Sequence, residues 1–405
     1  MDFWRPLIGT RAPSKPETVP AMLEWRDEQL AAYPAGVELG ETDLLKWYKK
    51  ALGKARPWKA CGPDGIHAFW WKNLPSAARK LGDLVVEWLK TGKVNTGWFC
   101  RGRTVLVPKK GDLSRPGNYR PITCLNTCYK LFTSVINEVL RSHLEKGNAI
   151  AANQRALRTR EWGCIHALLL DRAVVTDAMS QKQKALSVAW LDYKKAFDFI
   201  PHDYLRWVLE AVRLPPMALL ALRRLMSDWS TRFEWRTHET GGLTRSQRMP
   251  VLNGIFQGDA LSPTLFVLCV APISYALARG VQPYQSSAGK LTGHSFELGH
   301  QFYMDDLKLY ASNPVDLKTQ LDIVSTVSEA MGIRLNVGKC ASAHYDPHCK
   351  WTDAIEESPD GDRKITVLGL NESYKYLGID LVERISRSAV LGTARVVRAH
   401  LAISP

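Results

Sequence analysis

Two adjacent aspartates, Asp305 and Asp306, lie between two apolar runs in the stretch HQFYMDDLKLYA at 300–311. Two such runs around a short polar centre predict a β-hairpin, with both carboxylates at its tip. Neighbouring carboxylates repel each other, and Asp alone is a frequent turn residue. The pair therefore points to a functional site only if other residues of the chain support that interpretation.

A third carboxylate, Asp192, lies near the end of a nearly continuous apolar run at 185–193. Such a run is typical of a strand that is buried on both faces of a sheet. If this strand neighbours the hairpin, the three carboxylates converge, and a cation is needed to neutralise them. Mg²⁺ is the expected ion, because it prefers oxygen ligands and bridges to substrate phosphates. Two such ions would activate an attacking hydroxyl and stabilise a leaving pyrophosphate.

The pattern around these carboxylates predicts an α+β fold. After the first strand we expect helices at 202–214, 262–280 and 314–332, and one further strand at 333–339. This order is typical of a mainly antiparallel sheet backed by helices on one face. The apolar stretch at 261–278 resembles a membrane span in length, but its two prolines favour a buried helix.

Several residues far from the carboxylates are candidate nucleotide-binding groups. Lys109 and Arg120 supply cations that can grip a triphosphate. Gln257 and Gly258 precede a predicted helix, where a side chain and a bare backbone can approach a nucleotide. Phe197 can form a flat wall under an incoming sugar and exclude a 2′-hydroxyl.

The charge of the chain favours a polyanionic partner. The 54 Lys and Arg exceed the 40 Asp and Glu, which gives a net charge of +14, and nucleic acid is the commonest polyanion. A basic run interleaved with aromatic residues is a candidate phosphate contact, with a solvated face as the alternative: Arg223, Arg224, Trp229, Arg232, Phe233, Trp235 and Arg236.

The cysteines indicate reduced thiols inside a cell. The chain has eight Cys and no CxxC pair. The spacing of Cys340, His344, His348 and Cys349 is compatible with zinc, but Cys340 is expected to continue an apolar strand. We therefore do not expect zinc at this cluster.

The motifs YRPITCL, AWLDYKKAFD, FQGDALSP and YMDDLKLYA together resemble the reverse transcriptases of non-LTR (LINE-type) retrotransposons. The resemblance extends from about residue 56 to about residue 385, with the motifs in family order. It implies a right-hand polymerase with helical and strand fingers, a ferredoxin-like palm and a largely missing thumb. It also implies RNA-directed DNA synthesis, with transfer from a dNTP to a primer 3′-hydroxyl, in the setting of target-primed reverse transcription.

The same resemblance implies a domain organisation along the chain. The expected parts are an N-terminal extension at 1–55, fingers at 56–185, a palm at 186–340, the end of the palm with a primer-grip hairpin at 341–385, and the start of a thumb or a truncated connector at 386–405. Because the chain stops at Pro405, soon after the primer-grip position, we expect a polymerase core or a fragment of a longer protein.

Matching the motifs position by position implies a role for each candidate residue. The expected roles are metal binding and catalysis for Asp192, Asp305 and Asp306, triphosphate binding for Lys109 and Arg120, a sugar gate for Phe197, nucleotide positioning for Gln257 and Gly258, contact with the leaving pyrophosphate for Lys339, and primer grip for Tyr376, Leu377 and Gly378. The implied cofactors are two Mg²⁺ ions, with Mn²⁺ as a substitute. The implied partners are an RNA template, a DNA primer or target and dNTPs, without a membrane.

One departure and two alternatives accompany this interpretation. Gln154 is present where relatives have a Gln, but the glycine that usually follows it is missing, so the template contacts of the fingers stay open. The chain could instead be a catalytically impaired nucleic-acid-binding remnant, or an RNA-templated RNA polymerase, against which Phe197 argues. The lifestyle of the family implies action in the nucleus after synthesis in the cytoplasm, and the oligomeric state stays open.

Overall fold

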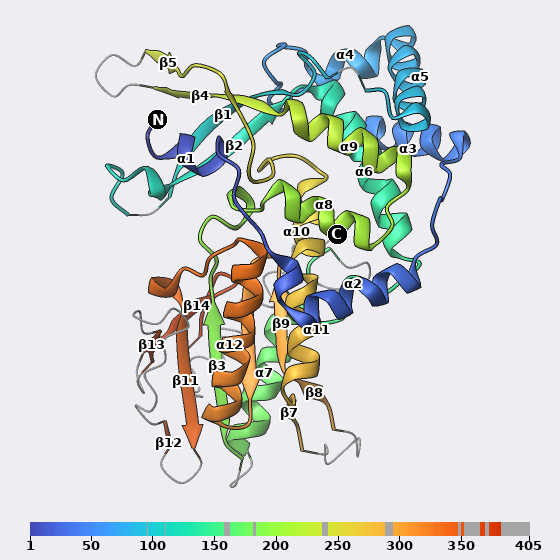
Figure 1. Cartoon of the computed structure of the whole chain (residues 1–405). Helices are drawn as coiled ribbons and strands as arrows, with labels where there is room; N and C mark the ends of the chain where they lie inside the picture. The colour runs from blue at the N-terminus through green and yellow to red at the C-terminus, as the bar shows by residue number, and fades with distance from the viewer. Residues whose placement is uncertain are drawn as a thin grey trace. The chain divides into compact units, whose positions relative to one another are not determined.

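The computed structural model describes most of the chain and divides it into two compact units (Figure 1). The described residues are 1–94, 96–109, 111–157, 163–180, 184–236, 242–287, 295–346, 350–351, 365–368 and 372–381. Unit 1 combines residues 1–150 with 195–269, and unit 2 combines 151–194 with 270–405. The chain therefore passes from one unit to the other three times, and each unit is assembled from segments that are distant in sequence.

Unit 1 is built from helices and one sheet. Its elements in chain order are α1 (Trp4–Ile8), η1 (Pro16–Thr18), α2 (Pro20–Ala32), α3 (Glu41–Lys54), α4 (Ala68–Asn73), α5 (Pro75–Thr91), β1 (Arg101–Pro108), η2 (Pro116–Asn118), β2 (Tyr119–Leu125), α6 (Thr127–Leu144), η3 (Ala196–Asp198), α8 (His202–Ala211), α9 (Pro216–Asp228), β4 (Ser230–Arg236), β5 (Leu243–Arg245), β6 (Met249–Pro250) and α10 (Ser262–Cys269).

The sheet of unit 1 has five strands in the order β2-β1-β4-β5, with β6 also paired to β4 (Figure 1). β1 and β2 form an antiparallel hairpin, and β4 joins β1 in parallel. One face is sealed by Thr104, Thr123 and Thr231, whose hydroxyls form a buried hydrogen-bonded row at 2.7 and 2.8 Å. Phe233, which is also buried, stacks on Trp4 with a centroid distance of 5.4 Å. This face is therefore the core side of the sheet.

The first 55 residues are packed into unit 1. α3 contacts α5 and α6, and α2 contacts α8. The contact between α2 and α8 includes stacking of Trp25 on Trp207, with a centroid distance of 5.9 Å. Buried aromatic pairs of this kind contribute to folding beyond their buried area. The segment predicted as an extension therefore contributes to the core of this unit.

Unit 2 is built around a second sheet. Its elements in chain order are α7 (Cys164–Ser180), β3 (Leu186–Leu191), α11 (Ala271–Gly280), β7 (Tyr284–Gln285), β8 (Glu297–Leu298), β9 (His300–Tyr303), β10 (Asp306–Ala311), α12 (Pro314–Met331), η4 (Val337–Lys339), β11 (Ala341–Asp346), β12 (Lys350–Trp351), β13 (Thr366–Val367), β14 (Tyr374–Tyr376) and β15 (Ile379–Leu381).

The six-stranded sheet of unit 2 has the order β12-β11-β3-β10-β9, with β13 also paired to β11. β3 is buried along its whole length, as its apolar run predicts, and lies between β10 and β11. Cross-strand pairing of Trp190 with Lys308 puts both side chains on the same face as Tyr310. That face is covered by α7, because Asp171 of α7 contacts both Lys308 and Tyr310. In Figure 1, α12 lies in front of the strands and α7 behind them.

The secondary structure confirms most of the predicted elements and corrects three. Helices cover both faces of the sheet, instead of one. The predicted strand at 333–339 is instead an isolated bridge at Leu335 followed by η4, because the segment bends to bond with Asp192. The predicted helix at 262–280 is interrupted at Val270 and forms α10 and α11, where Pro272 removes a backbone donor.

The stretch at 262–280 is the part of the described chain that is long and apolar enough to span a membrane by length and composition. In the folded protein, however, 72% of it is buried. Burial of this extent fits the helix of a protein core that the sequence predicts.

Candidate active site

The three predicted carboxylates all lie in unit 2, at neighbouring strand ends. The antiparallel register pairs Leu307 of β10 with Leu191 of β3. One position further along, Asp306 therefore lies opposite Asp192, and cross-strand neighbours of this kind are in side-chain contact range. Asp305 occupies the turn between β9 and β10. The strand and the hairpin are thus neighbours in one sheet, as the convergence of the three residues requires.

The carboxylates interact electrostatically. Burial, together with the charges of Asp305 and Asp192, raises the pKa of Asp306 to about 7, against the opposing effect of Lys339. A raised carboxyl pKa in a group of like charges is typical of sites that bind a cation or transfer protons. Binding of a positively charged ligand at the three carboxylates is therefore favourable.

The donor set fits a divalent cation but is not preassembled. Among the residues that the structure describes, no group of three or more His, Cys, Asp and Glu side chains is arranged to hold a metal ion. The Oδ2 atom of Asp192 instead accepts a hydrogen bond from Asn336 Nδ2 at 2.9 Å and lies 3.7 Å from Lys339 Nζ. Carboxylate oxygens are the ligands that hard divalent cations prefer, so Asp192, Asp305 and Asp306 would hold the ion.

Gln154 supports the turn that carries the aspartates, a role that the sequence did not reveal. Met304 has a positive φ of 57°, which is uncommon for a residue other than glycine. Gln154 is buried; its Oε1 accepts from Met304 N at 3.1 Å, and its Nε2 donates to Met304 O at 3.3 Å. One side chain therefore bonds both the backbone N–H and the backbone carbonyl of Met304, a strained residue next to Asp305.

Asn336 has the corresponding role for Asp192. Its side chain donates to the carboxylate, and its backbone N–H donates to the Asp192 carbonyl at 2.7 Å. Lys194 N also donates to Arg334 O at 2.9 Å. These bonds explain why the segment around Leu335 follows the end of β3 instead of forming a strand of its own. Asn336 lies in the same stretch as the predicted Lys339, LNVGKC at 335–340.

The predicted primer-grip residues form a tight hairpin beside the carboxylates. β14 and β15 pair around Leu377 and Gly378, whose φ values of 48° and 86° are typical of a two-residue hairpin turn. Tyr374 stacks on Trp190 with a centroid distance of 5.1 Å, and its hydroxyl donates to the Lys339 carbonyl. Tyr376 is buried, so its side chain belongs to the core, and only the turn is available to a primer.

The predicted nucleotide-binding residues all lie in unit 1. Lys109 and Arg120 are exposed at the far end of the β1–β2 hairpin, where Val107 pairs with Arg120 and Lys109 N donates to Asn118 O at 2.8 Å. The two cations are thus placed together, on one hairpin. Their exposure leaves both side chains able to reach a phosphate.

Phe197, Gln257 and Gly258 are gathered around one loop. Ile255 N donates to Phe197 O at 2.8 Å, and Thr123 N donates to Gln257 O at 2.8 Å. Gly258 has a φ of 120°, and a Cβ atom there would lie 2.9 Å from the Thr123 carbonyl oxygen. Only glycine therefore lets this loop approach β2 so closely.

Asp198 and Lys195 are two charged neighbours in this loop region, and the sequence analysis did not predict a role for either. Burial raises the pKa of Asp198 to about 6, against the opposing effects of Lys195, Gln257 and Lys109. Burial lowers the pKa of Lys195 to about 8, and its ammonium lies 4.1 Å from the ring centroid of Trp4. Gln257 Nε2 donates to Asp198 Oδ1 at 3.3 Å. A predicted site residue is thus held by a buried carboxylate.

The structure separates the predicted residues into two groups, one in each unit. The carboxylates, Lys339 and the primer-grip turn belong to unit 2, and the five nucleotide-binding candidates belong to unit 1. In the basic run, Trp229 and Phe233 are buried, so they cannot stack on bases. Of the zinc-like cluster, Cys340 and His344 are buried in unit 2, and His348 and Cys349 lie outside the described residues.

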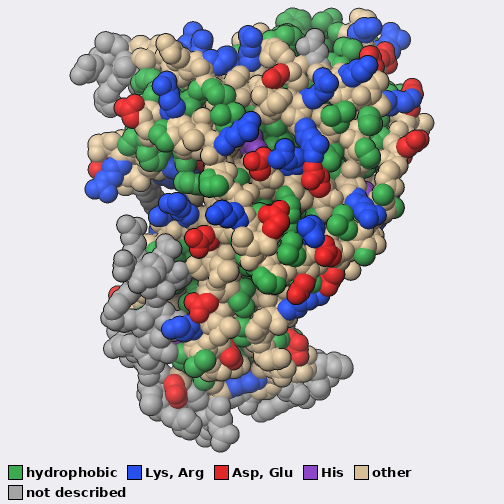
Figure 2. Space-filling model, viewed as in Figure 1, with side chains coloured by type: hydrophobic (Ala, Val, Ile, Leu, Met, Phe, Trp, Pro, Cys, Tyr) green, Lys and Arg blue, Asp and Glu red, His purple; other side chains and the backbone are tan. Residues whose placement is uncertain are grey.

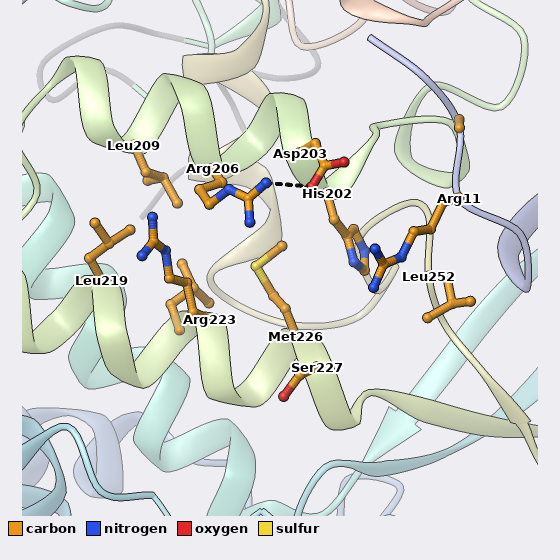
Figure 3. Close-up of a pocket in the computed structure, with 12 residues that line it drawn as sticks. Arg11, His202, Asp203, Arg206, Leu209, Leu219, Arg223, Met226, Ser227 and Leu252 are labelled. Carbon is orange, nitrogen blue, oxygen red and sulfur yellow. Dashed lines mark hydrogen bonds and ion pairs between the residues drawn. The ribbon is translucent and has the colours of Figure 1, made fainter.

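A pocket of about 260 Å³ lies between α8 and α9 in unit 1 (Figure 3). Apolar side chains form much of its lining, and Arg11, Arg206 and Arg223 project around it. Arg206 is paired with Asp203 at 2.6 Å, and Arg223 is paired with Glu210. None of the predicted site residues lines this pocket, so it is separate from the candidate active site.

Comparison with known proteins gives one family. The model of the family described as reverse transcriptase (RNA-dependent DNA polymerase) matches residues 107–381. This range contains all three carboxylates, Lys109 and Arg120, the loop of Gln257 and the turn predicted to grip the primer.

Curated relatives are polyproteins of retrotransposable elements. The chain is similar to a "Retrovirus-related Pol polyprotein from type-1 retrotransposable element R2" of Popillia japonica, with 28% identity over 63% of this chain and 33% of the relative. The corresponding protein of Nasonia vitripennis is 26% identical over 79% of this chain and 29% of the relative. A type-2 element R2DM polyprotein of Drosophila melanogaster is 26% identical over 79% and 28%. The chain thus spans about a third of the length of these relatives or less.

Proposed function

Because this chain belongs to the reverse transcriptase (RNA-dependent DNA polymerase) family, we propose that it synthesises DNA on an RNA template by extending a primer 3′-hydroxyl with dNTPs. The similarity of the chain to polyproteins of retrotransposable elements supports target-primed reverse transcription as the setting. Family membership implies nucleic acid template and primer and nucleotide substrates. Insertion into genomic DNA would require action in the nucleus, after synthesis in the cytoplasm.

The observation that carries this proposal is the placement of Asp192 and Asp306 opposite each other, with Asp305 in the adjoining turn. Asp192 is distant in sequence from the adjacent pair Asp305 and Asp306, and their proximity is unfavourable by itself, because the charges of Asp192 and Asp305 help to raise the pKa of Asp306. Gathering like charges lowers the stability of the folded state, and clusters of this kind are typical of sites that bind a ligand.

Reverse transcriptases are generally dependent on divalent metal ions. We propose two Mg²⁺ ions, with Mn²⁺ as a substitute, which would lower the pKa of the primer hydroxyl and neutralise the leaving pyrophosphate. Asp192, Asp305 and Asp306 would hold the ions. Without the ions, Asn336 and Lys339 hold the Asp192 carboxylate. Binding of an ion to Asp192 would release Lys339, which would then neutralise the pyrophosphate.

The remaining residues would bind and orient the substrates. Lys109 and Arg120 would grip the triphosphate, Gln257 and Gly258 would position the nucleotide, and Phe197 would exclude a 2′-hydroxyl. Phe197 is held flat by stacking on Phe266 with an interplanar angle of 11° and a centroid distance of 4.8 Å. A ring held this rigidly is suited to reject a sugar by steric contact. The hairpin turn at Leu377 and Gly378 would hold the primer end.

Primer extension on an RNA template tests this function. The wild-type protein and an Asp305→Ala, Asp306→Ala variant would be given Mg²⁺ and a labelled primer, with dNTPs or NTPs. The proposal predicts incorporation of dNTPs by the wild type alone. Incorporation that survives in the variant would refute the metal-site assignment.

The same assay distinguishes the two alternatives. A preference for NTPs would identify an RNA polymerase and refute the role of Phe197 as a sugar gate. Binding of the template without extension at any metal concentration would identify a catalytically impaired remnant.

A further inference from the structure

The outer face of the unit 1 sheet carries a row of arginines. In β1 and β4, which run parallel, Arg103 pairs with Arg232, and Arg101 pairs with Ser230. Paired residues on adjacent strands point to the same side, which is the side away from Phe233 and the threonine row. Thr231 pairs with Met249 of β6, so Arg248 comes next to Arg232 on this face. Arg245 of β5 joins them through its pairing with Glu234.

One carboxylate on this face, Glu234, already has an arginine bound to each of its oxygens. Glu234 is buried; its Oε2 accepts from Arg103 Nη1 at 3.2 Å, and its Oε1 accepts from Arg245 Nε at 3.1 Å. Among the residues that the structure describes, no ion pair or side-chain hydrogen bond joins Arg101, Arg232 or Arg248 to any group. The face therefore contains a compensated part around Glu234 and an uncompensated part beside it.

Two of the three uncompensated arginines have a buried donor without an acceptor, and the third, Arg101, is exposed. Arg232 Nε and Arg248 Nη1 are shielded from solvent and have no hydrogen-bond partner. Burial lowers the pKa of Arg248, and repulsion from Arg101 and Arg232 lowers it further. Like charges on neighbouring strands destabilise a sheet, and a buried donor that makes no hydrogen bond adds a further cost. An anion that accepts from these guanidinium groups would remove both penalties.

We propose that Arg101, Arg232 and Arg248 form a binding site for a phosphate group of a single-stranded nucleic acid backbone. Guanidinium groups suit this ligand because their planar donors match phosphate oxygens. The choice of nucleic acid over another phosphate source rests on the proposed function and on the net charge of +14.

The site is distinct from the predicted triphosphate site. Arg101 begins β1 and Lys109 follows its end, so at about 3.3 Å per residue the two lie roughly 26 Å apart. One nucleotide cannot span that distance. The bound phosphate must therefore belong to another part of a strand, and at about 3.4 Å per stacked nucleotide a strand would need roughly eight nucleotides to reach both ends.

A contact to phosphate predicts a particular change in binding. It adds affinity without reading sequence, and each lost contact reduces the slope of log Kd against log salt by about 1. A variant that weakens RNA binding through misfolding would lose affinity together with thermal stability. The salt slope and the melting temperature thus separate the two explanations.

The test compares Arg232→Gln, Arg248→Gln with the matched control Arg245→Gln, which lies on the same face but leaves Glu234 paired to Arg103. Full-length proteins would bind labelled 20-nucleotide single-stranded RNAs of two unrelated sequences across a salt series, with thermal melting in parallel. The proposal predicts about a tenfold or greater rise in Kd for both RNAs, a slope reduced by about 2, and an unchanged or higher melting temperature. The control should change Kd and slope much less.

Two further arms keep the outcome decisive. Arg232→Lys, Arg248→Lys retains the charge, so its slope should stay near that of the wild type while Kd rises less than for the Gln pair. Inorganic phosphate should raise the melting temperature of the wild type but not that of the Gln pair. An unchanged Kd and slope in the Gln pair would overturn the proposal, and so would stabilisation by phosphate without any effect on RNA binding. If the wild type fails to extend primers but these binding results hold, the proposed function fails and the phosphate site stands.

Discussion

Strand β10 carries two charged residues, two positions apart, whose surroundings are opposite. Lys308 is completely buried, and its Nζ lies 2.6 Å from Asp171 Oδ1 and 4.2 Å from the ring centroid of Trp190. Asp306 meets Asp305 and Asp192, which raise its pKa. The first charge is compensated by a buried ion pair, whereas the second belongs to a group of three carboxylates that only the exposed Lys339 opposes among the described residues.

The sheet of unit 1 repeats this contrast with the signs reversed. Glu234 is compensated by two arginines, whereas Arg101, Arg232 and Arg248 beside it have no carboxylate partner among the described residues. Buried pairs of the first kind hold a fold in one arrangement. Clusters of the second kind reduce stability until a ligand binds, which makes them better indicators of function than any single charged residue.

Asp306→Asn should have the largest effect, and on activity alone. Loss of one metal ligand should reduce primer extension by about 10³- to 10⁴-fold, since charge stabilisation by a metal is worth several kcal/mol. The melting temperature without metal should stay the same or rise at pH 8, because one of three repelling charges is gone. Mg²⁺ should raise the melting temperature of the wild type more than that of the variant. A variant that loses stability would place Asp306 among the structural charges.

Lys308→Met should have the opposite result, with a large effect on stability. It leaves Asp171 buried without its partner, at a cost of about 3–4 kcal/mol in the free energy of unfolding. Adding Asp171→Asn should recover most of this loss, because no unpaired charge remains. Lys339→Met is the matched control: that lysine is 65% exposed and 3.7 Å from Asp192, so its loss should cost less than about 1 kcal/mol. Denaturant unfolding of the four proteins would measure each difference.

Asp198 is an intermediate case, a buried carboxylate with cations nearby but not in an ion pair. Burial raises its folded-state pKa to about 6 from the ordinary value of 3.8, so the folded state binds its proton more tightly than the unfolded state. Its contribution to stability is therefore complete below about pH 4 and is lost as the pH rises through about 6. Asp198→Asn should match the wild type near pH 4 and exceed it by about 2–3 kcal/mol at pH 8. Equal pH profiles for the two proteins would contradict this.

The residues that can be read from sequence are those whose chemistry is visible in a short stretch. Asp192, Asp305 and Asp306 stand at the ends of apolar runs, and strand periodicity is enough to bring the runs together. Lys308 and Asp171 cannot be read this way, since nothing in either segment shows that they meet. Most of the elements follow from periodicity, but the bend after Gly332 depends on the hydrogen bonds between Asn336 and Asp192.

The arginine cluster illustrates the same limit for a whole site. Arg232 belongs to a basic run that is visible in the sequence, but Arg101 begins β1 and Arg248 immediately precedes β6. Only the register of β1, β4 and β6 shows that the three are neighbours. The aromatic residues Trp229 and Phe233 of that run face the core, because their burial contributes more to folding than their exposure would.

Gln154→Met should give the smallest effect and shows how a neutral side chain serves the charged site. The variant loses both hydrogen bonds to Met304, at a cost of about 1–2 kcal/mol in stability, and it frees the strained turn that carries Asp305. Primer extension should fall about tenfold or more, because small displacements of catalytic groups are costly. Asn153→Ala is the control, since its side chain bonds to His300 O at 2.9 Å, at the other end of β9. If the two variants reduce primer extension equally, Gln154 supports the hairpin as a whole and has no special role at the turn.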